Sequence, residues 1–427
     1  MYRRSYIAAA IFFVIVSSSD THAQTQSITL NEALEMARRV NPQLIQAEGA
    51  INIAQASRRE SLGDWLPSVS GSSGWSTNST SRFDPQTQRT VDGSATSMSA
   101  SLSASMVIFD GFRRNAQGRA RTADYESAEV TLISQEFQIA LQTKQAFFNA
   151  VAAEELVRVS ETRIDRATQQ LDIARNRLAA GSAIRSDTLS SFVELGNARL
   201  QLLNAQTQLA GASANLARLV GVDGLVRAVA DSNIQFQADL DTAFLREEAL
   251  ANGPGVQQAI AQSRAAQAQV TVSRAQYFPS VSASYNRSIS GAGFSTLNPS
   301  WSTRLSLSWS IFNGFTRETN VVRSRIQADV ADAQVEDIRR QINAQLTQQF
   351  ASIQSALVRL EIAEASRVAA QEDLRVQQER YRLGAGTIIE ILSSQVNLDQ
   401  AEVDIVQARL DYMVAKAEIE ALVGREL

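Results

Sequence analysis

The chain has 427 residues and a formal net charge of −4, which gives no reason to expect nucleic acid as a partner. It contains no cysteine, and its single histidine, His22, lies in the N-terminal segment, so the rest lacks disulfides, thiolate metal sites and the commonest general bases and zinc ligands. We therefore predict a protein that is not an enzyme and that holds no cofactor or metal ion.

Residues 1–23 are typical of a cleaved secretory signal peptide. Two arginines precede an apolar run at residues 7–16, and Thr21 and Ala23 suit the −3 and −1 positions of a signal-peptidase site. The run is too short to span a bilayer as a helix, and no later segment contains about eighteen consecutive apolar residues. We predict a secreted chain without a membrane-spanning helix.

The remainder of the chain is predicted to be an internal duplication. Pro42 and Pro67 recur as Pro254 and Pro279, in both cases 212 residues later. The motif FDGF recurs as FNGF 203 residues later, and this second spacing then holds to the end of the chain. The nine-residue difference falls in a polar stretch before Phe109, which we interpret as a lengthened loop.

Each repeat is predicted to contain a helix, a β-hairpin, a long helix, a turn and a returning helix. All six prolines lie before the long helices or in loops, as uninterrupted helices require. The predicted units are a first repeat at 24–221, a linker at 222–245 and a second repeat at 246–427. Within them we place hairpins at about 67–110 and 279–313, and turns at about 178–188 and 381–391.

The helices carry a heptad pattern that predicts coiled-coil seams. In the last helix, apolar residues fall every seven positions, at Leu398, Ile405, Tyr412 and Ile419. Alanines interleaved at spacings of three and four would let the helix backbones approach closely. The heptads alone leave a soluble helical bundle open. The segment from about Asn115 to Ala180, roughly 100 Å long as a helix, favours a rod that crosses a gap.

The hairpins are predicted from a two-residue alternation of polar and apolar side chains. One face is rich in serine, and the other carries Met98, Leu102, Met106, Leu305, Leu307 and Trp309. At about ten residues each, the four strands are long enough to cross a bilayer when tilted. The small polar face, and aromatic residues such as Trp75 and Trp301 near the strand ends, favour a membrane barrel with its apolar face toward lipid. A soluble sheet that packs one face on the helices and exposes the other face to solvent is the alternative.

Four strands cannot close a barrel by themselves. Open sheet edges in lipid would leave backbone hydrogen-bonding groups unsatisfied, so we predict that further copies of the chain complete the barrel. Two copies would give eight strands and a lumen filled by side chains. Three copies would give twelve strands, with room for a channel.

The order of these features over residues 28–427 resembles the TolC family of outer-membrane efflux proteins. The resemblance rests on the duplicated plan, the strand starts LPSVS and FPSVS, the strand exits FDGF and FNGF, and two helix-turn segments. It implies a mostly α-helical fold with membrane β-structure. The implied assembly is a homotrimer with a twelve-stranded β-barrel in the outer membrane of a Gram-negative bacterium, continuous with a twelve-helix coiled-coil α-barrel through the periplasm.

The function implied by the resemblance is a passive exit duct for type I protein secretion or multidrug efflux. The implied partners are outer-membrane lipid, a periplasmic adaptor (membrane fusion) protein and an inner-membrane pump of the ABC or RND type. A trimeric coiled-coil adhesin of the outer membrane is the alternative. Such adhesins end in their strands, whereas this chain ends in a predicted helix, and this order favours the duct.

Two turns, RLAAGSAIRSDTL and YRLGAGTIIEIL, join each long helix to the helix that returns. Glycine ends a helix readily because it accepts left-handed backbone, and an acid follows six residues later, Asp187 or Glu390. Such an acid near a helix start can simply cap free amides, which is an open alternative to a functional role. The resemblance implies that these turns form the periplasmic entrance and dock the adaptor through Gly181, Ser182, Gly384, Gly386 and Thr387.

The resemblance also implies a gate at this entrance. Glu390 matches an acidic ring, in which three like charges would raise one another's pKa and attract cations. Tyr381 and Asp187 match positions that hydrogen-bond between neighbouring coils in closed members. This sequence departs from the family at Ser393, where a second acid is expected, and at Gly386, where an arginine is expected. We predict a gate that is weaker and less blocked by cations than in members with all these groups.

Overall fold

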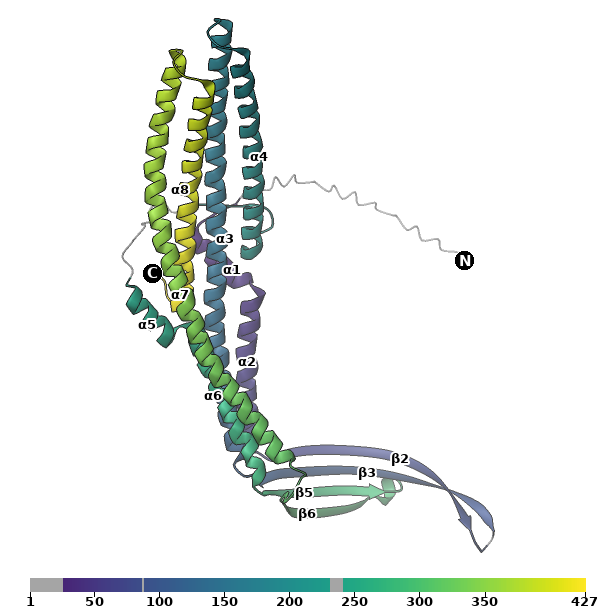
Figure 1. Ribbon diagram of the computed structural model, residues 1–427. Helices are drawn as coiled ribbons and strands as arrows, with labels where there is room; N and C mark the ends of the chain where they lie inside the picture. The colour runs from purple at the N-terminus through teal and green to yellow at the C-terminus, as the bar shows by residue number, and fades with distance from the viewer. Residues whose placement is uncertain (1–25, 87, 231–240) are drawn as a thin grey trace, which may run out of the picture.

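A computed structural model describes residues 26–86, 88–230 and 241–427, which form a rod of helices with a small sheet at one end (Figure 1). The two longest helices, α3 (Arg113–Ala179) and α7 (Thr316–Arg382), have 67 residues each and run the length of the rod. The predicted long helix is therefore confirmed. Of the helices described, none is both long and apolar enough to cross a membrane.

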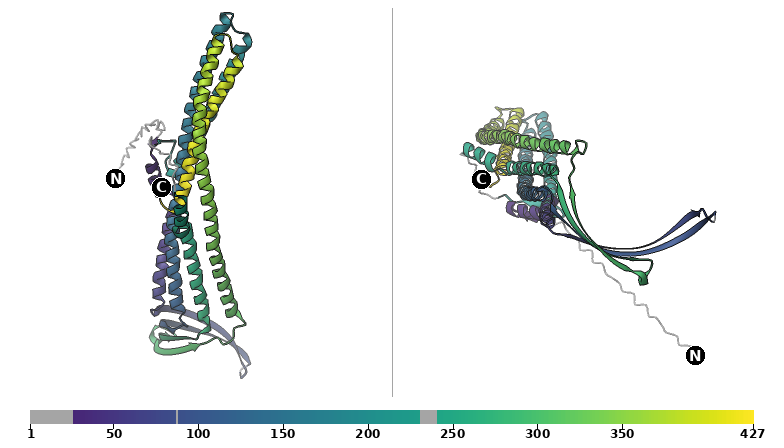
Figure 2. Two further views of the ribbon diagram at one scale, coloured as in Figure 1. Left: turned by 60° about the vertical axis from the view of Figure 1, so that its left-hand side comes forward. Right: turned by 90° about the horizontal axis from the view of Figure 1, so that it is seen from below.

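Shorter helices flank each long helix (Figures 1 and 2). Those beside α3 are α1 (Leu30–Val40), α2 (Pro42–Gly63) and α4 (Arg185–Val220). Those beside α7 are α5 (Thr242–Asn252), α6 (Pro254–Arg274) and α8 (Ile388–Val423). In the half of the rod away from the sheet, the helices lie in the order α4, α3, α8, α7, so that α4 and α7 form the two edges of this layer.

The helices pack along the seams that the heptads predict. On α8, Leu398, Ile405, Tyr412 and Ile419 are all at most 6% exposed. Leu360 and Ala363 of α7 pack against Ile405 and Ala408 of α8, and α3 and α4 have an equivalent cluster. The small residues allow this close approach, as expected for a coiled-coil seam.

The middle of the rod carries a two-stranded parallel sheet made of β1 (Gln26–Ile28) and β4 (Val226–Ala228). Ile28 and Val226 are buried against Phe147 of α3 and Leu216 of α4. β4 lies within the predicted linker at 222–245, whose residues 231–240 are outside the described part of the chain. This packing fixes β1 and β4 to the first long helix, α3.

The main sheet is antiparallel, with strand order β2-β3-β5-β6. Its strands are β2 (Ser68–Asp84), β3 (Arg89–Phe109), β5 (Ser280–Gly291) and β6 (Asn298–Ser308). Short 3₁₀ turns precede β5 and β6, at Ala275–Tyr277 and Phe294–Thr296. The two hairpins pair through β3 and β5, which leaves β2 and β6 as edge strands.

The strand register sorts the side chains onto two faces, as predicted. Serine hydroxyls pair across β2 and β3 at 2.8 Å, as in Ser70–Ser103 and Ser72–Ser101. On the opposite face, directly paired residues place Met106, Ala283 and Leu305 in one row. Met98, Leu102 and Leu307 belong to the same apolar face by this register.

Two sequence predictions about the strands are wrong. β2 and β3 have 17 and 21 residues rather than about ten, and the extra polar stretch extends both strands instead of a loop. Trp75 therefore lies in the middle of β2 rather than near its end. Trp309 lies one residue beyond β6, where its indole Nε1 donates to the carbonyl of Tyr277 at 3.3 Å. In the extended parts of β2 and β3, serine and threonine occupy both faces, so polar and apolar residues do not alternate. The sequence therefore does not reveal the full length of these strands.

Partly buried ion pairs join the two helical hairpins. The Nη2 atom of Arg166 on α3 lies 2.8 Å from Glu402 and 2.5 Å from Asp399, both on α8. Arg163 of α3 pairs with Asp399 at 3.0 Å and with Glu194 of α4 at 2.7 Å. These five side chains are at most 20% exposed. Removing one member would leave an uncompensated buried charge, so the network couples the hairpins.

The strand exits FDGF and FNGF hold equivalent glycines in different surroundings. Gly111 and Gly314 have left-handed backbone, with φ of +68° and +64°. A Cβ atom on Gly111 would lie 2.5 Å from Cβ of Phe278 and 2.8 Å from the carbonyl oxygen of Ala275, whereas Gly314 has no neighbour within 4 Å. Phe278 belongs to the strand start FPSVS before β5, so Gly111 allows the β2–β3 hairpin and the β5–β6 hairpin to pack closely together.

We predict that Gly111→Ala destabilises the protein more than its matched control, Gly314→Ala. Both substitutions force alanine into left-handed backbone, which costs about 1–2 kcal/mol. The clash with Phe278 occurs only at Gly111 and adds about 1–3 kcal/mol. Thermal unfolding of the detergent-solubilised protein, followed by circular dichroism, measures the difference. Equal losses for the two variants would contradict the role of close packing.

Candidate functional site

The turns of the two helical hairpins lie together at the end of the rod opposite the sheet (Figure 1). The α3–α4 turn spans 180–184, and the α7–α8 turn spans 383–387. All the residues that the sequence assigns to a gate or to adaptor docking fall on these turns or on the helix ends beside them. This helical tip is therefore the candidate site.

Both long helices end in the same hydrogen-bonded motif. At the end of α3, the amides of Gly181 and Ser182 donate to the carbonyls of Leu178 and Arg177 at 3.0 and 2.9 Å. At the end of α7, Gly384 and the next residue make the equivalent bonds at 3.0 and 2.8 Å. The left-handed glycines, with φ of +73° and +78°, permit these caps, as the sequence predicts.

The two returning helices begin differently. α8 starts with a capping box, in which the amide of Thr387 donates to Glu390 Oε2 at 2.7 Å and the amide of Glu390 donates to the Thr387 hydroxyl at 3.3 Å. The N-cap residue of α4 is Ile184, whose side chain makes no capping hydrogen bond and is 66% exposed. The start of α8 is therefore more firmly fixed than the start of α4.

Tyr381 links the two turns. Its hydroxyl donates to Asp187 Oδ2 at 3.0 Å, and the guanidinium of Arg177 lies 4.2 Å above its ring. The side chain is only 3% exposed and packs in a cluster with Ile388 and Ile391. Burial, followed by the bond to Asp187, raises the pKa of the Tyr381 phenol above its usual value. The phenol therefore stays a donor across physiological pH.

Glu390 is held by its own helix end. Besides the capping box, its Oε1 atom lies 3.7 Å from Arg380 Nη1. The backbone bond from Thr387, with a smaller contribution from Arg380, lowers the pKa of the Glu390 carboxyl within one chain. In an acidic ring, the Glu390 carboxylates of neighbouring copies would raise one another's pKa, so the two effects would oppose each other. The carboxylate serves as a helix cap and remains available for a charged ring.

The structure gives the surroundings of Gly386 and Ser393, the two positions at which the resemblance implies a charged residue instead. A Cβ atom on Gly386 would lie 3.1 Å from the Tyr381 amide nitrogen and 3.3 Å from Glu390 Oε2. An arginine here would require these neighbours to shift by a few tenths of an ångström. Ser393 is exposed on α8, and the adjacent Ser394 donates to Asp373 of α7 at 2.5 Å.

Sequence reasoning missed the two arginines of the tip. Arg177 stacks on Tyr381 and donates to the carbonyl of Ser182 at 2.8 Å, while Arg380 faces Glu390. The signal was available, because Arg177 and Arg380 are 203 residues apart and so occupy equivalent positions in the two repeats.

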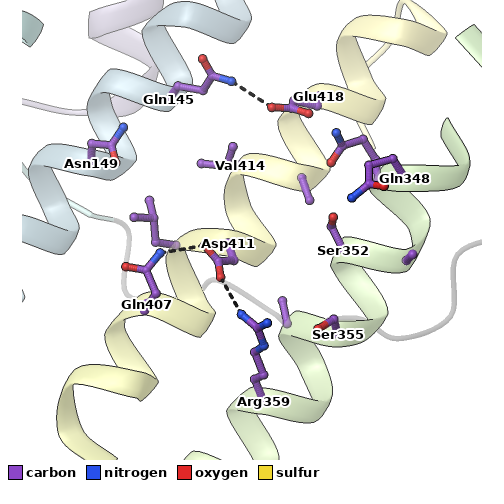
Figure 3. A pocket seen from close by; sticks show the side chains of 15 residues that line it. Gln145, Asn149, Gln348, Ser352, Ser355, Arg359, Gln407, Asp411, Val414 and Glu418 are labelled. Atoms are coloured by element: carbon purple, nitrogen blue, oxygen red, sulfur yellow. Dashed lines mark hydrogen bonds and ion pairs between the residues drawn. The ribbon is translucent and has the colours of Figure 1, made fainter. Parts of the chain in front are cut away.

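A second polar feature lies midway along the rod, where α3, α7 and α8 line a groove of about 750 Å³ (Figure 3). Gln145 donates to Glu418 at 3.1 Å, and Asp411 accepts from Gln407 at 2.8 Å and pairs with Arg359 at 3.6 Å. Burial raises the pKa of the Glu418 carboxyl. Across the residues described, no three acidic or histidine side chains are grouped to hold a metal ion. The groove is therefore lined mainly by polar side chains that bond to one another.

Comparison with known proteins identifies the family. The family described as "Outer membrane efflux protein" matches residues 33–222 and 245–425. The Pyoverdine export outer membrane protein OpmQ of Pseudomonas aeruginosa is 28% identical over 79% of this chain and 71% of the relative. The Outer membrane protein TolC of Escherichia coli is 23% identical over 96% of this chain and 85% of the relative.

A solved structure shares the fold. The outer membrane protein VceC from Vibrio cholerae has a TM-score of 0.80, with 16% identity over 93% of this chain and 96% of that chain. The family match covers most of the chain and confirms the resemblance drawn from the sequence motifs. The chain therefore belongs to the outer membrane efflux protein family, which includes TolC.

Proposed function

We propose that this protein is a passive export duct of the outer membrane, built as a homotrimer. The observation that carries the proposal is an apolar-faced sheet with two unpaired edges, joined by short connections to a rod built on two 67-residue helices. Three copies would supply a twelve-stranded barrel and a twelve-helix tunnel. The adhesin alternative is not favoured, because the relatives named above are outer membrane export proteins and the family is one of efflux proteins.

The sheet and the helical layer support the same head-to-tail assembly. The edge strand β2 and the edge helix α4 belong to the first repeat, whereas β6 and α7 belong to the second. A ring of copies would therefore pair β2 with β6 of a neighbour and pack α4 against α7 of the same neighbour. Such a heterologous interface generates a closed ring when its rotation closes.

The edge helices carry apolar side chains that the single chain leaves uncovered. On α4 these are Leu189, Phe192, Val193, Leu200 and Leu203, each at least 55% exposed. On α7 they include Val358, Ile362 and Val368, each at least 49% exposed. Contiguous exposed apolar surface of this kind marks an interaction site, and a second copy of the chain fits it.

The tip is proposed as the periplasmic gate, with Asp187, Tyr381, Glu390 and Ser393 around the entrance. The turn residues Gly181, Ser182, Gly384, Gly386 and Thr387 are proposed to dock a periplasmic adaptor protein. An inner-membrane pump would supply the energy. The hydrogen bond between Tyr381 and Asp187 supports this assignment, because it ties one hairpin to the other at the end of the rod.

We predict that the detergent-extracted protein is a trimer that forms pores. Light scattering after size-exclusion chromatography should give three chains per particle, and addition to a planar lipid bilayer should give discrete conductance steps. Burial of the apolar sheet face and pairing of the edge strands are the physical reasons. A monodisperse monomer that is soluble without detergent would rule out the shared barrel.

We predict that Tyr381→Phe and Asp187→Ala each increase the open fraction of the pore. Either change removes the bond that joins the hairpins, which is worth about 1–3 kcal/mol because its acceptor is charged. Bilayer conductance of the two variants and of the double variant measures the effect. The double variant should add little to the single ones, since all three lose the same contact. Fully additive effects would show that the two residues act separately.

We predict that Glu390→Gln weakens block by divalent cations while the tip remains folded. Glutamine can keep the capping box with Thr387 but removes the negative charge. Conductance is measured with and without millimolar divalent cations. Block of the parent protein is expected to be modest, because Ser393 stands where the resemblance implies a second acidic residue. Strong block at low concentration that survives Glu390→Gln would show that another group binds the cation.

A further inference from the structure

The polar face of the sheet carries an isolated positive charge. In the rows shared by all four strands (68–74, 99–105, 284–290 and 298–304), the charged residues are Arg287 and Arg304 alone. Arg304 lies directly opposite Ser284, which pairs with Ser105, which in turn pairs with Ser68. One row across the polar face therefore consists of one arginine and three serines.

The surroundings leave this charge uncompensated. Arg304 is exposed and has no ion-pair partner among the described residues of the chain. The side chains that flank it on the polar face, such as Ser284, Ser302 and Ser306, are short and uncharged. The guanidinium therefore projects farther from the sheet than the serine hydroxyls around it. Arg304 is four residues before the end of β6, which is about 13 Å along the strand at 3.3 Å per residue.

Arg287 provides an internal comparison because it lies on the other face. It is paired with Trp301 and Leu102, whose row belongs to the apolar face of the sheet. The two arginines thus share one hairpin and differ in the side of the sheet to which they belong. Only Arg304 would face the lumen if the barrel forms.

We propose that Arg304 forms a ring of positive charge inside the barrel, which makes the membrane section of the duct favour anionic solutes. This inference rests on the proposed trimeric duct. Rings of arginine or lysine select anions in pores, just as rings of acids select cations. The duct would then carry opposite charges at two levels, Glu390 at the periplasmic tip and Arg304 within the membrane.

The absence of cysteine makes a direct test of the local potential practical. Ser284→Cys introduces a single thiol opposite Arg304, and Ala283→Cys places one on the apolar face. The trimer in lipid vesicles is treated with an anionic and a cationic methanethiosulfonate reagent, and the ratio of their two reaction rates is measured. A change in the intrinsic reactivity of the thiol affects both reagents equally and so cancels in this ratio. An open or closed tip likewise leaves the ratio unchanged.

We expect the anionic-to-cationic rate ratio at Ser284→Cys to fall at least about threefold when Arg304→Gln is added. A potential of one kT per unit charge changes this ratio about sevenfold, because the reagents differ by two charges. The effect should be present in 0.01 M salt, where the Debye length is about 30 Å, and absent in 1 M salt, where it is about 3 Å. Arg304→Lys and Arg287→Gln are the controls and should leave the ratio unchanged.

The outcomes separate this inference from the proposed function. If Ser284→Cys reacts and Ala283→Cys is protected, but Arg304→Gln leaves the ratio unchanged, the barrel stands and the role of Arg304 is wrong. If the two thiols react equally, the barrel itself is wrong and the inference fails with it. A fall of the ratio caused equally by Arg287→Gln would also overturn the proposal, because it would show a general charge effect.

Discussion

The whole architecture depends on the backbone groups at the edges of one small sheet. β2 and β6 each pair on one side only, and one face of the sheet is mostly apolar, with Arg287 as a charged exception. In a bilayer such edges must be paired, because lipid offers no hydrogen-bond partners. Three residues join β3 to α3 and seven residues join β6 to α7, so a ring that closes the sheet also brings the helices of neighbouring copies together. The exposed apolar residues of α4 and α7 lie where that second ring would close.

The sequence predicts those parts of the fold that depend on local periodicity. The heptads of α8 and the left-handed glycines at 181 and 384 are confirmed because each is a short-range property. The length of β2 and β3 was mispredicted because a run of serine, threonine and asparagine fits loop and strand alike. The stacking of Arg177 on Tyr381 joins residues 204 positions apart, so spacing along the chain cannot indicate it.

The seam between the two helical hairpins contains buried polar groups without hydrogen-bond partners near the tip. Arg166 pairs with Asp399, yet one helical turn nearer the tip both amide atoms of Gln170 and the amide nitrogen of Gln395 are buried without a hydrogen-bond partner in the described chain. Buried polar groups of this kind weaken an interface, because each unmade bond costs about 1–3 kcal/mol. The two hairpins also differ at the tip. A capping box stabilises the start of α8, whereas the start of α4 at Ile184 has no side-chain cap.

These features fit a gate whose closed state is only moderately favoured. The bond from Tyr381 to Asp187 holds the hairpins together in each copy, while the unsatisfied amides of Gln170 make the same seam easier to part. Shifting a two-state equilibrium from 1:99 to 99:1 takes about 5.5 kcal/mol. In the proposed trimer, three such bonds of about 1–3 kcal/mol each, one per copy, span that range. In the proposed trimer, a partner that competes for the turn residues of every copy would therefore open the duct by binding alone, without a source of energy in this chain.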